Sequence, residues 1–115
     1  MGGLVNVAVL FTDIVGSTAL ASRVGPEAAE GLRHEHFALL RSCIERGGGR
    51  EVKNLGDGLM VAFDAPSSAV AAGVEMQQHL DRRNRNDPSV ERLAIRVGIS
   101  TGEVDCDDDG DLFGP

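Results

Sequence analysis

Two aspartates occupy positions from which their carboxylates could hold a metal ion. Asp13 follows closely on the apolar run 4–11, and Asp57 lies in the turn 56–58 (Gly-Asp-Gly) between two apolar stretches. Carboxylates with few other protein ligands suit Mg²⁺ or Mn²⁺, which keep water ligands and bind substrate phosphates. Taken alone, the pattern also allows a structural role, with Asp13 as a turn or cap residue and Asp57 as a hairpin residue.

The segment directly after Asp13 could bind phosphate. Residues 14–18 read Ile-Val-Gly-Ser-Thr, and Ser17 or Thr18 is predicted to cap a short helix that reaches about Arg23. Backbone N–H groups at a helix N-terminus bind anions. A metal beside a bound phosphate chain suits phosphoryl or nucleotidyl transfer by two metal ions. The candidate phosphate-binding residues are Ile14, Val15, Gly16, Ser17 and Thr18.

The elements that must position these residues follow one another in the order βααββαβ. The run 4–11 predicts a strand buried on both faces. Long helices are predicted to begin at Pro26 and at Pro66, because proline is pre-set for the first helical turn. The remaining strands are predicted over residues 50–55, 59–63 and 93–99, the first two joined by an Asp-Gly hairpin turn.

This order is that of an α+β, ferredoxin-like (split βαβ) sandwich. In such a sheet the first and third strands are expected to be neighbours at the centre. The two carboxylates would then converge at one end of the sheet. Many unrelated functions use this fold, so the fold alone does not identify the activity.

The length of the chain indicates one domain, and its acidic residues are concentrated near the C-terminal end. The chain has 115 residues and a net charge of −7, with six of its 18 acidic residues in the last thirteen positions. We expect a single domain over residues 1–115 and an acidic loop or hairpin over 101–115. The acidic balance argues against a partner that is nucleic acid or a membrane surface. Four phenylalanines without Tyr or Trp also leave little for base stacking.

Other features of the sequence favour a cytoplasmic location. No apolar run is long enough to cross a membrane, and the N-terminus has no signal-like segment. Cys43 and Cys106 fit no metal-ligand spacing and form no disulfide framework. His34 and His36 are two residues apart on a helix and cannot form a metal pair. We interpret them, together with His79, as surface or helix-flank residues.

Four segments resemble the class III adenylyl and guanylyl cyclases. Residues 10–18 (LFTDIVGST) resemble the first metal motif of that family, and residues 52–60 (VKNLGDGLM) resemble its second. Residues 97–103 (VGISTGE) look like the strand that follows, and residues 111–114 (DLFG) like the segment before the last catalytic elements. The matches come in the family's order and span positions 5–115. The sequence Ile-Val-Gly-Ser-Thr in the first motif is most similar to the bacterial members of the family.

The resemblance implies an adenylate cyclase that converts ATP to 3′,5′-cyclic AMP and pyrophosphate. Asp13 and Asp57 would hold two metal ions, Mg²⁺ or Mn²⁺, with the backbone carbonyl of Ile14 as a further ligand. The metals would activate the ribose 3′-hydroxyl. Lys53 and Asp111 would read the purine, a pair that favours adenine. The family's active sites lie at the interface of a head-to-tail dimer, so the partner would be a second copy.

The sequence also departs from the family. An Asn and an Arg that stabilise the transition state normally follow the aspartate that matches Asp111, and the sequence has no such positions. We therefore interpret the chain as the N-terminal two thirds of the catalytic domain, weak or inactive alone, because losing one positioned donor typically costs ~10²–10³ in rate. The alternatives are a catalytically silent, cyclase-like regulatory or nucleotide-binding domain, and a guanylate cyclase.

Two rival interpretations are weaker. Residues 105–110 (DCDDDG) match the opening of a calcium-binding EF-hand loop. An EF-hand needs a helix before that loop, whereas residues 92–100 alternate like a strand, so a solvated acidic hairpin tip is the better interpretation. RNA-recognition domains share the strand order, but their third strand carries stacking aromatics, and here it has a single Phe.

Overall fold

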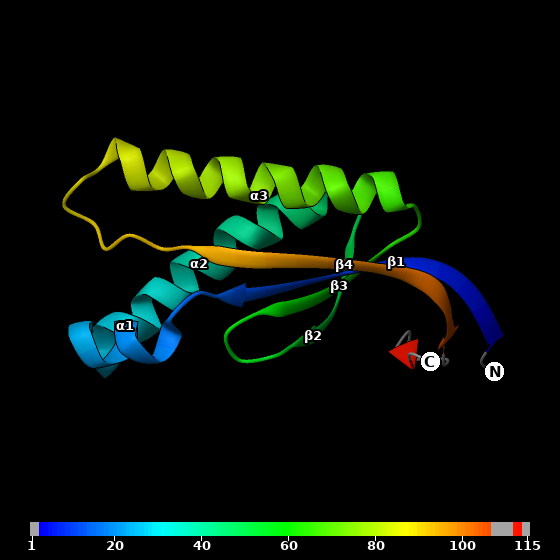
Figure 1. The fold of residues 1–115 in the computed structure, drawn as a ribbon, viewed down its shortest axis with the longest axis horizontal. Helices are drawn as coiled ribbons and strands as arrows, with labels where there is room; N and C mark the ends of the chain where they lie inside the picture. Colours follow the sequence, from blue (N-terminus) through cyan, green and yellow to red (C-terminus); the bar gives the residue numbers. More distant parts are fainter. Residues whose placement is uncertain (1–2, 107–111, 114–115) are drawn as a thin grey trace.

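The structure is a computed structural model, and it describes residues 3–106 and 112–113 (Figure 1). Within these residues, three helices and five strands follow one another. Their bounds are β1 (Gly3–Ile14), α1 (Ser17–Val24), α2 (Pro26–Arg46), β2 (Arg50–Asn54), β3 (Leu59–Phe63), α3 (Pro66–Asn86), β4 (Ile95–Cys106) and β5 (Leu112–Phe113). Both long helices begin at a proline, as predicted.

All five strands belong to one antiparallel sheet in the order β2-β3-β1-β4-β5. The first four strands have the arrangement of a split βαβ sandwich, so the predicted fold class is confirmed. β1 lies between β3 and β4, with Phe11 opposite Met60 on one side and opposite Gly98 on the other. β4 is longer than predicted because it pairs with β1 along its whole length, from Gly3 to Ile14.

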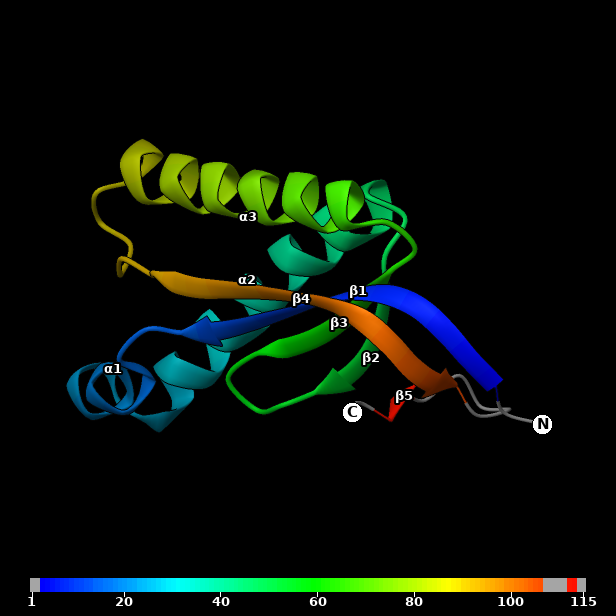
Figure 2. The same cartoon turned by 45° about the vertical axis from the view of Figure 1, so that its right-hand side comes forward.

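The helices α2 and α3 lie on the same side of the sheet, as Figures 1 and 2 show. The main core forms there, between the inward residues of the strands and the apolar stripes of the helices. Its fully buried members include Ala8, Leu10, Leu40, Leu59, Val61 and Met76. The other face carries a smaller cluster made of strand residues only: Val7, Val9, Val52, Met60 and Ala62.

The prediction that the first strand is buried on both faces is only partly correct. Ala8 and Leu10 are fully buried on one face. On the opposite face Val9 is buried, but Phe11 remains 39% exposed. Side chains alternate along a strand, and no helix of the described part covers the face to which Phe11 belongs. Within the described residues, this apolar run is thus fully buried on one face and only partly buried on the other.

His36 is a second correction, because it is buried rather than a surface residue. Its side chain is 1% exposed, and neither ring nitrogen has a hydrogen-bond partner. Burial, together with the positive charge of Arg83, lowers the pKa of this imidazole from 6.5 to about 4. His36 is therefore a neutral core residue at neutral pH.

Asn84 joins the end of α3 to the segment that leads into β4. Its side-chain amide donates to the carbonyl oxygen of Leu93 (2.7 Å), and its side-chain oxygen accepts from the backbone N–H of Leu93 (3.1 Å). Buried polar groups need such partners. This pair of bonds explains how residues just before the strand remain ordered and buried without being part of the sheet.

Within the described residues, no helix combines the length and apolarity that a membrane crossing requires. The predicted cytoplasmic location stays a prediction. The residues of the EF-hand-like motif from Asp107 onward, and the predicted purine-reading residue Asp111, lie outside the described residues.

Candidate active site

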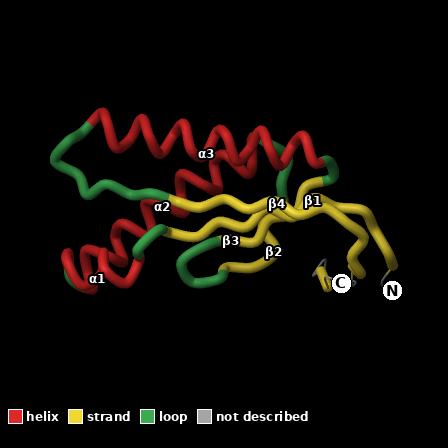
Figure 3. Tube along the Cα trace, viewed as in Figure 1, coloured by secondary structure: helices red, strands yellow, loops and turns green. Residues whose placement is uncertain are grey.

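The end of β1 lies beside the β2–β3 loop (Figure 3), and two hydrogen bonds join them. The N–H of Ile14 donates to the carbonyl oxygen of Asp57 (3.2 Å), and the N–H of Leu59 donates to the buried hydroxyl of Thr12 (3.0 Å). Asp57 itself makes the first bond, and Leu59, two residues further on, makes the second. They bring the backbones that carry Asp13 and Asp57 side by side, although the two residues are far apart in sequence.

Gly58 makes this approach possible. A Cβ atom at this position would lie 1.7 Å from the carbonyl oxygen of Thr12. Any side chain would therefore push the loop away from β1. The glycine after Asp57 is required for space, which adds a second reason to the turn chemistry that the Asp-Gly pair indicated.

Asp13 lies at the end of β1 with its side chain 55% exposed. It faces Arg96, its partner in the β1–β4 register, and their side chains form an ion pair of 3.3 Å. Asp13 thus offers a carboxylate that is accessible to solvent and already balanced by a cation of the protein.

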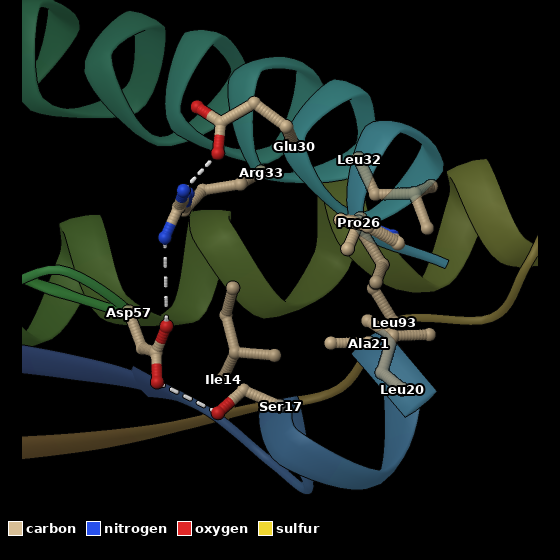
Figure 4. Close-up of a pocket in the computed structure, with 11 residues that line it drawn as sticks. Ile14, Ser17, Leu20, Ala21, Pro26, Glu30, Leu32, Arg33, Asp57 and Leu93 are labelled. Carbon is tan, nitrogen blue, oxygen red and sulfur yellow. Dashed lines mark hydrogen bonds and ion pairs between the residues drawn. The ribbon is translucent and has the colours of Figure 1, made fainter. Parts of the chain in front are cut away.

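Asp57 has a similar environment (Figure 4). Its side chain is 46% exposed, and its Oδ1 lies 3.9 Å from a guanidinium nitrogen of Arg33. Its Oδ2 accepts a hydrogen bond of 2.7 Å from the hydroxyl of Ser17. Arg33 also pairs with Glu30 on the same helix. The sequence had pointed to Asp57 and Ser17 separately, but gave no sign of their bond or of the two arginines.

The prediction that Ser17 or Thr18 caps α1 through its side chain is wrong for the described geometry. The N-cap residue is Gly16, in the left-handed conformation with φ 66°, and no side chain caps the helix. Positive φ favours glycine. The hydroxyl of Ser17 is instead committed to Asp57. The start of α1 is therefore tied to the carboxylate rather than to its own backbone.

The predicted phosphate segment divides into two parts. The N–H groups of Ile14 and Val15 already donate to the carbonyl oxygens of Asp57 and Ala94 (3.2 and 2.8 Å). The N–H groups that open α1 have no partner within the helix, as in any α-helix. Residues 16–18 are thus the part of the segment best placed to meet an anion.

A pocket with a volume of about 270 Å³ adjoins this region (Figure 4). Asp57, Ser17, Glu30 and Arg33 supply its polar lining. Side chains of α1, α2 and the segment before β4 supply the apolar lining, among them Leu20, Leu32 and Leu93. Asp57 thus lies at the wall of a pocket, whereas Asp13 is open to solvent.

The donor set at this end of the sheet fits a hard divalent cation. Both carboxylates offer oxygen, the ligand that Mg²⁺ and Mn²⁺ prefer. Each is half exposed and each faces an arginine, so this end of the sheet already balances its negative charge with cations. Asp13 and Asp57 could exchange these arginines for a metal without leaving a buried charge unpaired.

Lys53 lies on the helix-free face of the sheet. It pairs with Met60 on β3, next to a bulge in β2, and Met60 pairs with Phe11 on β1. Cross-strand partners share a face, and Asp13 follows Phe11 by two residues, so it belongs to the same face. The structure therefore puts Lys53 and Asp13 on one surface, separated by the width of β3.

Comparison with known proteins identifies the family that the chain resembles. The family model described as the adenylate and guanylate cyclase catalytic domain matches residues 2–112. The chain is 38% identical over 99 residues to the serine/threonine-protein kinase pkn2 of Myxococcus xanthus, a match that covers 86% of this chain and 12% of that protein. It is 28% identical over 107 residues to an adenylate cyclase of Anabaena cylindrica, covering 86% of this chain and 21% of that protein.

Among solved structures, the guanylyl cyclase Cya2 superposes with a TM-score of 0.81 and 31% identity. That match covers 90% of this chain and 57% of the Cya2 chain. The chain thus spans a small part of the curated relatives and little more than half of a solved cyclase domain. The Anabaena protein is named an adenylate cyclase and Cya2 a guanylyl cyclase. The comparisons therefore leave the choice between ATP and GTP open.

Proposed function

The chain belongs to the family of adenylate and guanylate cyclase catalytic domains, and we propose that it supplies the metal and nucleotide sites of an adenylate cyclase, which converts ATP to cyclic AMP and pyrophosphate. The observation that carries this proposal is the junction of β1 with the β2–β3 loop. There the Thr12, Ile14 and Gly58 contacts hold the backbone segments that carry Asp13 and Asp57 side by side, which supports a shared site.

Asp13 and Asp57 would hold two ions of Mg²⁺ or Mn²⁺, with the backbone carbonyl of Ile14 as a further ligand. When bound, such ions lower the pKa of the ribose 3′-hydroxyl and neutralise charge on the α-phosphate. The neighbouring side chains would position the two carboxylates and balance their charge. The Ser17 hydroxyl orients the Asp57 carboxylate through its 2.7 Å bond, and Arg33 and Arg96 balance the carboxylates until a metal replaces them.

The triphosphate would lie against the start of α1. The N–H groups of residues 16–18 point out of the helix end, where a negative charge is favoured. Gly16 contributes by its positive φ, which turns the chain from β1 into the helix. The phosphates would then lie next to Asp57, because Ser17 bonds to that residue.

For the purine we propose adenine, read by Lys53 and Asp111. A lysine donates a hydrogen bond to a ring nitrogen of adenine, and a carboxylate accepts one from its amine. The guanylate alternative is tested at the same position. Lys53→Glu should weaken binding of ATP relative to GTP, and an unchanged ratio would remove Lys53 from the purine site.

We further propose that the active form is a homodimer with its active sites at the interface. The support is the helix-free face of the sheet, where Phe11 is exposed and Val7 and Met60 are partly buried beside Asp13 and Lys53. A second copy that covers this face would bury the apolar residues and bring the purine-reading residues of one chain toward the metal residues of the other.

The test begins with binding, because binding can be measured whether or not the chain converts ATP. Calorimetry should show that the chain binds ATP in the presence of Mn²⁺ and much more weakly without it. Asp13→Asn and Asp57→Asn should each abolish the Mn²⁺ dependence. Asp64→Asn, at the opposite end of β3 and also exposed, is the matched control and should leave it unchanged.

Cyclic AMP is then measured in the same samples. Formation that disappears in Asp13→Asn would support the proposed reaction, at whatever rate this chain achieves. Mn²⁺-dependent ATP binding without any cyclic nucleotide would favour the alternative of a silent, nucleotide-binding cyclase-like domain. No Mn²⁺-dependent binding of either ATP or GTP would contradict the proposal.

A further inference from the structure

A second group of potential metal ligands lies away from the candidate active site, where the C-terminal half of α2 packs against α3. Cys43 comes from α2, and Glu75 and His79 come from successive turns of α3. One ligand atom of each, a sulfur, a carboxylate oxygen and a ring nitrogen, lies within 4.8 Å of the other two. Cys43 is ten residues beyond Arg33, which is about 15 Å along a helix.

The three donor atoms already converge on one cation. A single guanidinium nitrogen of Arg46, Nη2, lies 3.5 Å from the sulfur of Cys43 and 3.3 Å from Nε2 of His79. The same nitrogen forms an ion pair with Oε1 of Glu75. Nε2 of His79 is also 3.4 Å from that oxygen. One point in space is therefore within contact distance of all three ligand atoms.

We propose that Cys43, Glu75 and His79 form a site for Zn²⁺ or a similar thiophilic divalent ion, which replaces the Arg46 guanidinium. Three protein ligands and one water complete the tetrahedral coordination that zinc adopts in open sites. Thiolate and imidazole are the donors that select such an ion over Mg²⁺. The hard-ion site at Asp13 and Asp57 has neither, so the two sites differ in chemistry.

The charges balance in both states. Without metal, the Glu75 carboxylate is paired with the Arg46 guanidinium and Cys43 is a neutral thiol. When Zn²⁺ binds, Cys43 loses its proton to solvent and becomes a thiolate, and the two negative ligands neutralise the ion. Arg46 leaves the site at the same time. Its side chain is about half exposed, so it can turn into solvent without losing a place in the core.

The consequence would be a link between two helices. Cys43 is fully buried and belongs to the main core together with Ala72 and Met76 of α3. An ion bound to residues of both helices would hold α2 against α3. A ligand that binds only the folded state stabilises it in proportion to its concentration and affinity. The site would thus make the stability of the domain depend on zinc.

The experiment is a titration with Co²⁺, a spectroscopic substitute for Zn²⁺, in the Asp13→Asn, Asp57→Asn background that removes the hard-ion site. We expect one Co²⁺ per chain, a thiolate-to-cobalt charge-transfer band, and loss of the band when Zn²⁺ is added. The band should vanish in Cys43→Ser and persist in Cys106→Ser, the matched cysteine control. His79→Gln should weaken binding by about 10–100-fold or more, and His34→Gln should not.

Two further variants keep the test informative if Cys43→Ser does not fold. Glu75→Gln changes a partly exposed residue and should weaken Co²⁺ binding, whereas Arg46→Gln removes the competing cation and should tighten it. In thermal unfolding, Zn²⁺ should raise the midpoint of the background protein and not of its His79→Gln derivative. Absence of the thiolate band, or a band that survives in both Cys43→Ser and His79→Gln, would overturn the proposal.

Discussion

Single atoms decide whether Asp57 can reach the end of β1. Gly58 lies so close to β1 that a Cβ added to it would be 1.7 Å from the carbonyl oxygen of Thr12. Overpacking a rigid contact typically costs about 1–3 kcal/mol, and more where the backbone must move. The proposed metal site therefore depends on a residue that has no side chain.

Gly58→Ala should destabilise the domain by about 2–4 kcal/mol and weaken Mn²⁺ binding, because the loop that carries Asp57 must move away from β1. Urea unfolding followed by circular dichroism measures the first effect, and calorimetric Mn²⁺ titration the second. Gly98→Ala is the control, since a Cβ there meets nothing within 4 Å. Equal stability of the two variants would contradict this account of Gly58.

Thr12 makes a separate contribution through its hydroxyl, which accepts the N–H of Leu59 in a buried position. Thr12→Val keeps the shape of the side chain and leaves that N–H without a partner, which should cost about 1–3 kcal/mol. Thr12→Ser keeps the acceptor and should cost less. The comparison is made by urea unfolding, and a serine variant as unstable as the valine variant would show that the methyl group, not the hydrogen bond, matters.

The sequence predicted only those site residues that belong to a recognisable motif. Asp13 and Asp57 stand in recognisable contexts, a strand end and an Asp-Gly turn, and the resemblance to the cyclases adds their pairing. Arg33 and Arg96 have no such context. Arg96 faces Asp13 only because β4 pairs with β1 in one register, and Arg33 approaches Asp57 only because α2 lies over the loop. Contacts of this kind depend on the assembled sheet.

The same reason hid the proposed zinc ligands. Cys43 and Cys106 fit no ligand spacing, and His79 looked like an isolated helix residue. Glu75 and His79 share one face of α3 because they are four residues apart, but nothing local indicates that Cys43 of the neighbouring helix lies opposite. The packing of α2 on α3 creates the group.

The secondary-structure elements followed the sequence closely, with differences that have physical causes. Gly25 and Pro26 mark the start of α2 and Gly47 marks its end. The alternation of apolar with other residues over 93–99 predicted β4. That strand begins two residues later than predicted because Leu93 is held by Asn84. It also continues to Cys106, beyond the alternating stretch, because β1 offers a pairing partner along its whole length.

The packing of α2 should be sensitive to acid because of His36. The pKa of this imidazole is about 4 in the folded protein and 6.5 in the unfolded chain. A depressed pKa means that the unfolded state binds the extra proton first. Stability should therefore be complete above pH 6.5 and fall as the pH drops toward 4, by about 3 kcal/mol in total. Urea unfolding at a series of pH values measures this loss.

His36→Leu should remove most of that slope, and His34→Leu, which changes an exposed histidine of the same helix, should not. Arg83 of α3 is the charged group that adds to the effect of burial. Its partner Glu35 has a pKa below the usual value through its hydrogen bond to Arg83, so that carboxylate contributes its own loss only at lower pH. An unchanged slope in His36→Leu would assign the acid sensitivity to other groups.

Within the described residues, the sheet has one face covered by helices and one face without them. The helices α2 and α3 lie on the covered side (Figure 2). The other face carries an apolar row of β1 and β3 in which Phe11 is exposed and Val7 and Met60 are partly buried. Contiguous apolar surface of this kind marks an interaction site. The fold class followed from the order of elements, but the uncovered face did not, because an apolar strand run does not tell which side is covered.

We expect this face to mediate self-association. The molecular mass measured by light scattering should rise with protein concentration from that of a monomer toward that of a dimer. Phe11→Asp puts a charge at the most exposed residue of the apolar row and should keep the protein monomeric. Because each chain carries a net charge of −7, added salt should favour the dimer of the unmodified chain by screening repulsion.

The control must change an exposed apolar residue elsewhere. Val70 on the outer side of α3 is 52% exposed, more than Phe11, and does not lie on the helix-free face. If general surface hydrophobicity drove association, Val70→Asp would reduce it as much as Phe11→Asp does. If the helix-free face is the interface, Val70→Asp should associate like the unmodified chain. Circular dichroism must show that both variants are folded, and a dimer that persists in Phe11→Asp would mean that the two copies meet through another surface.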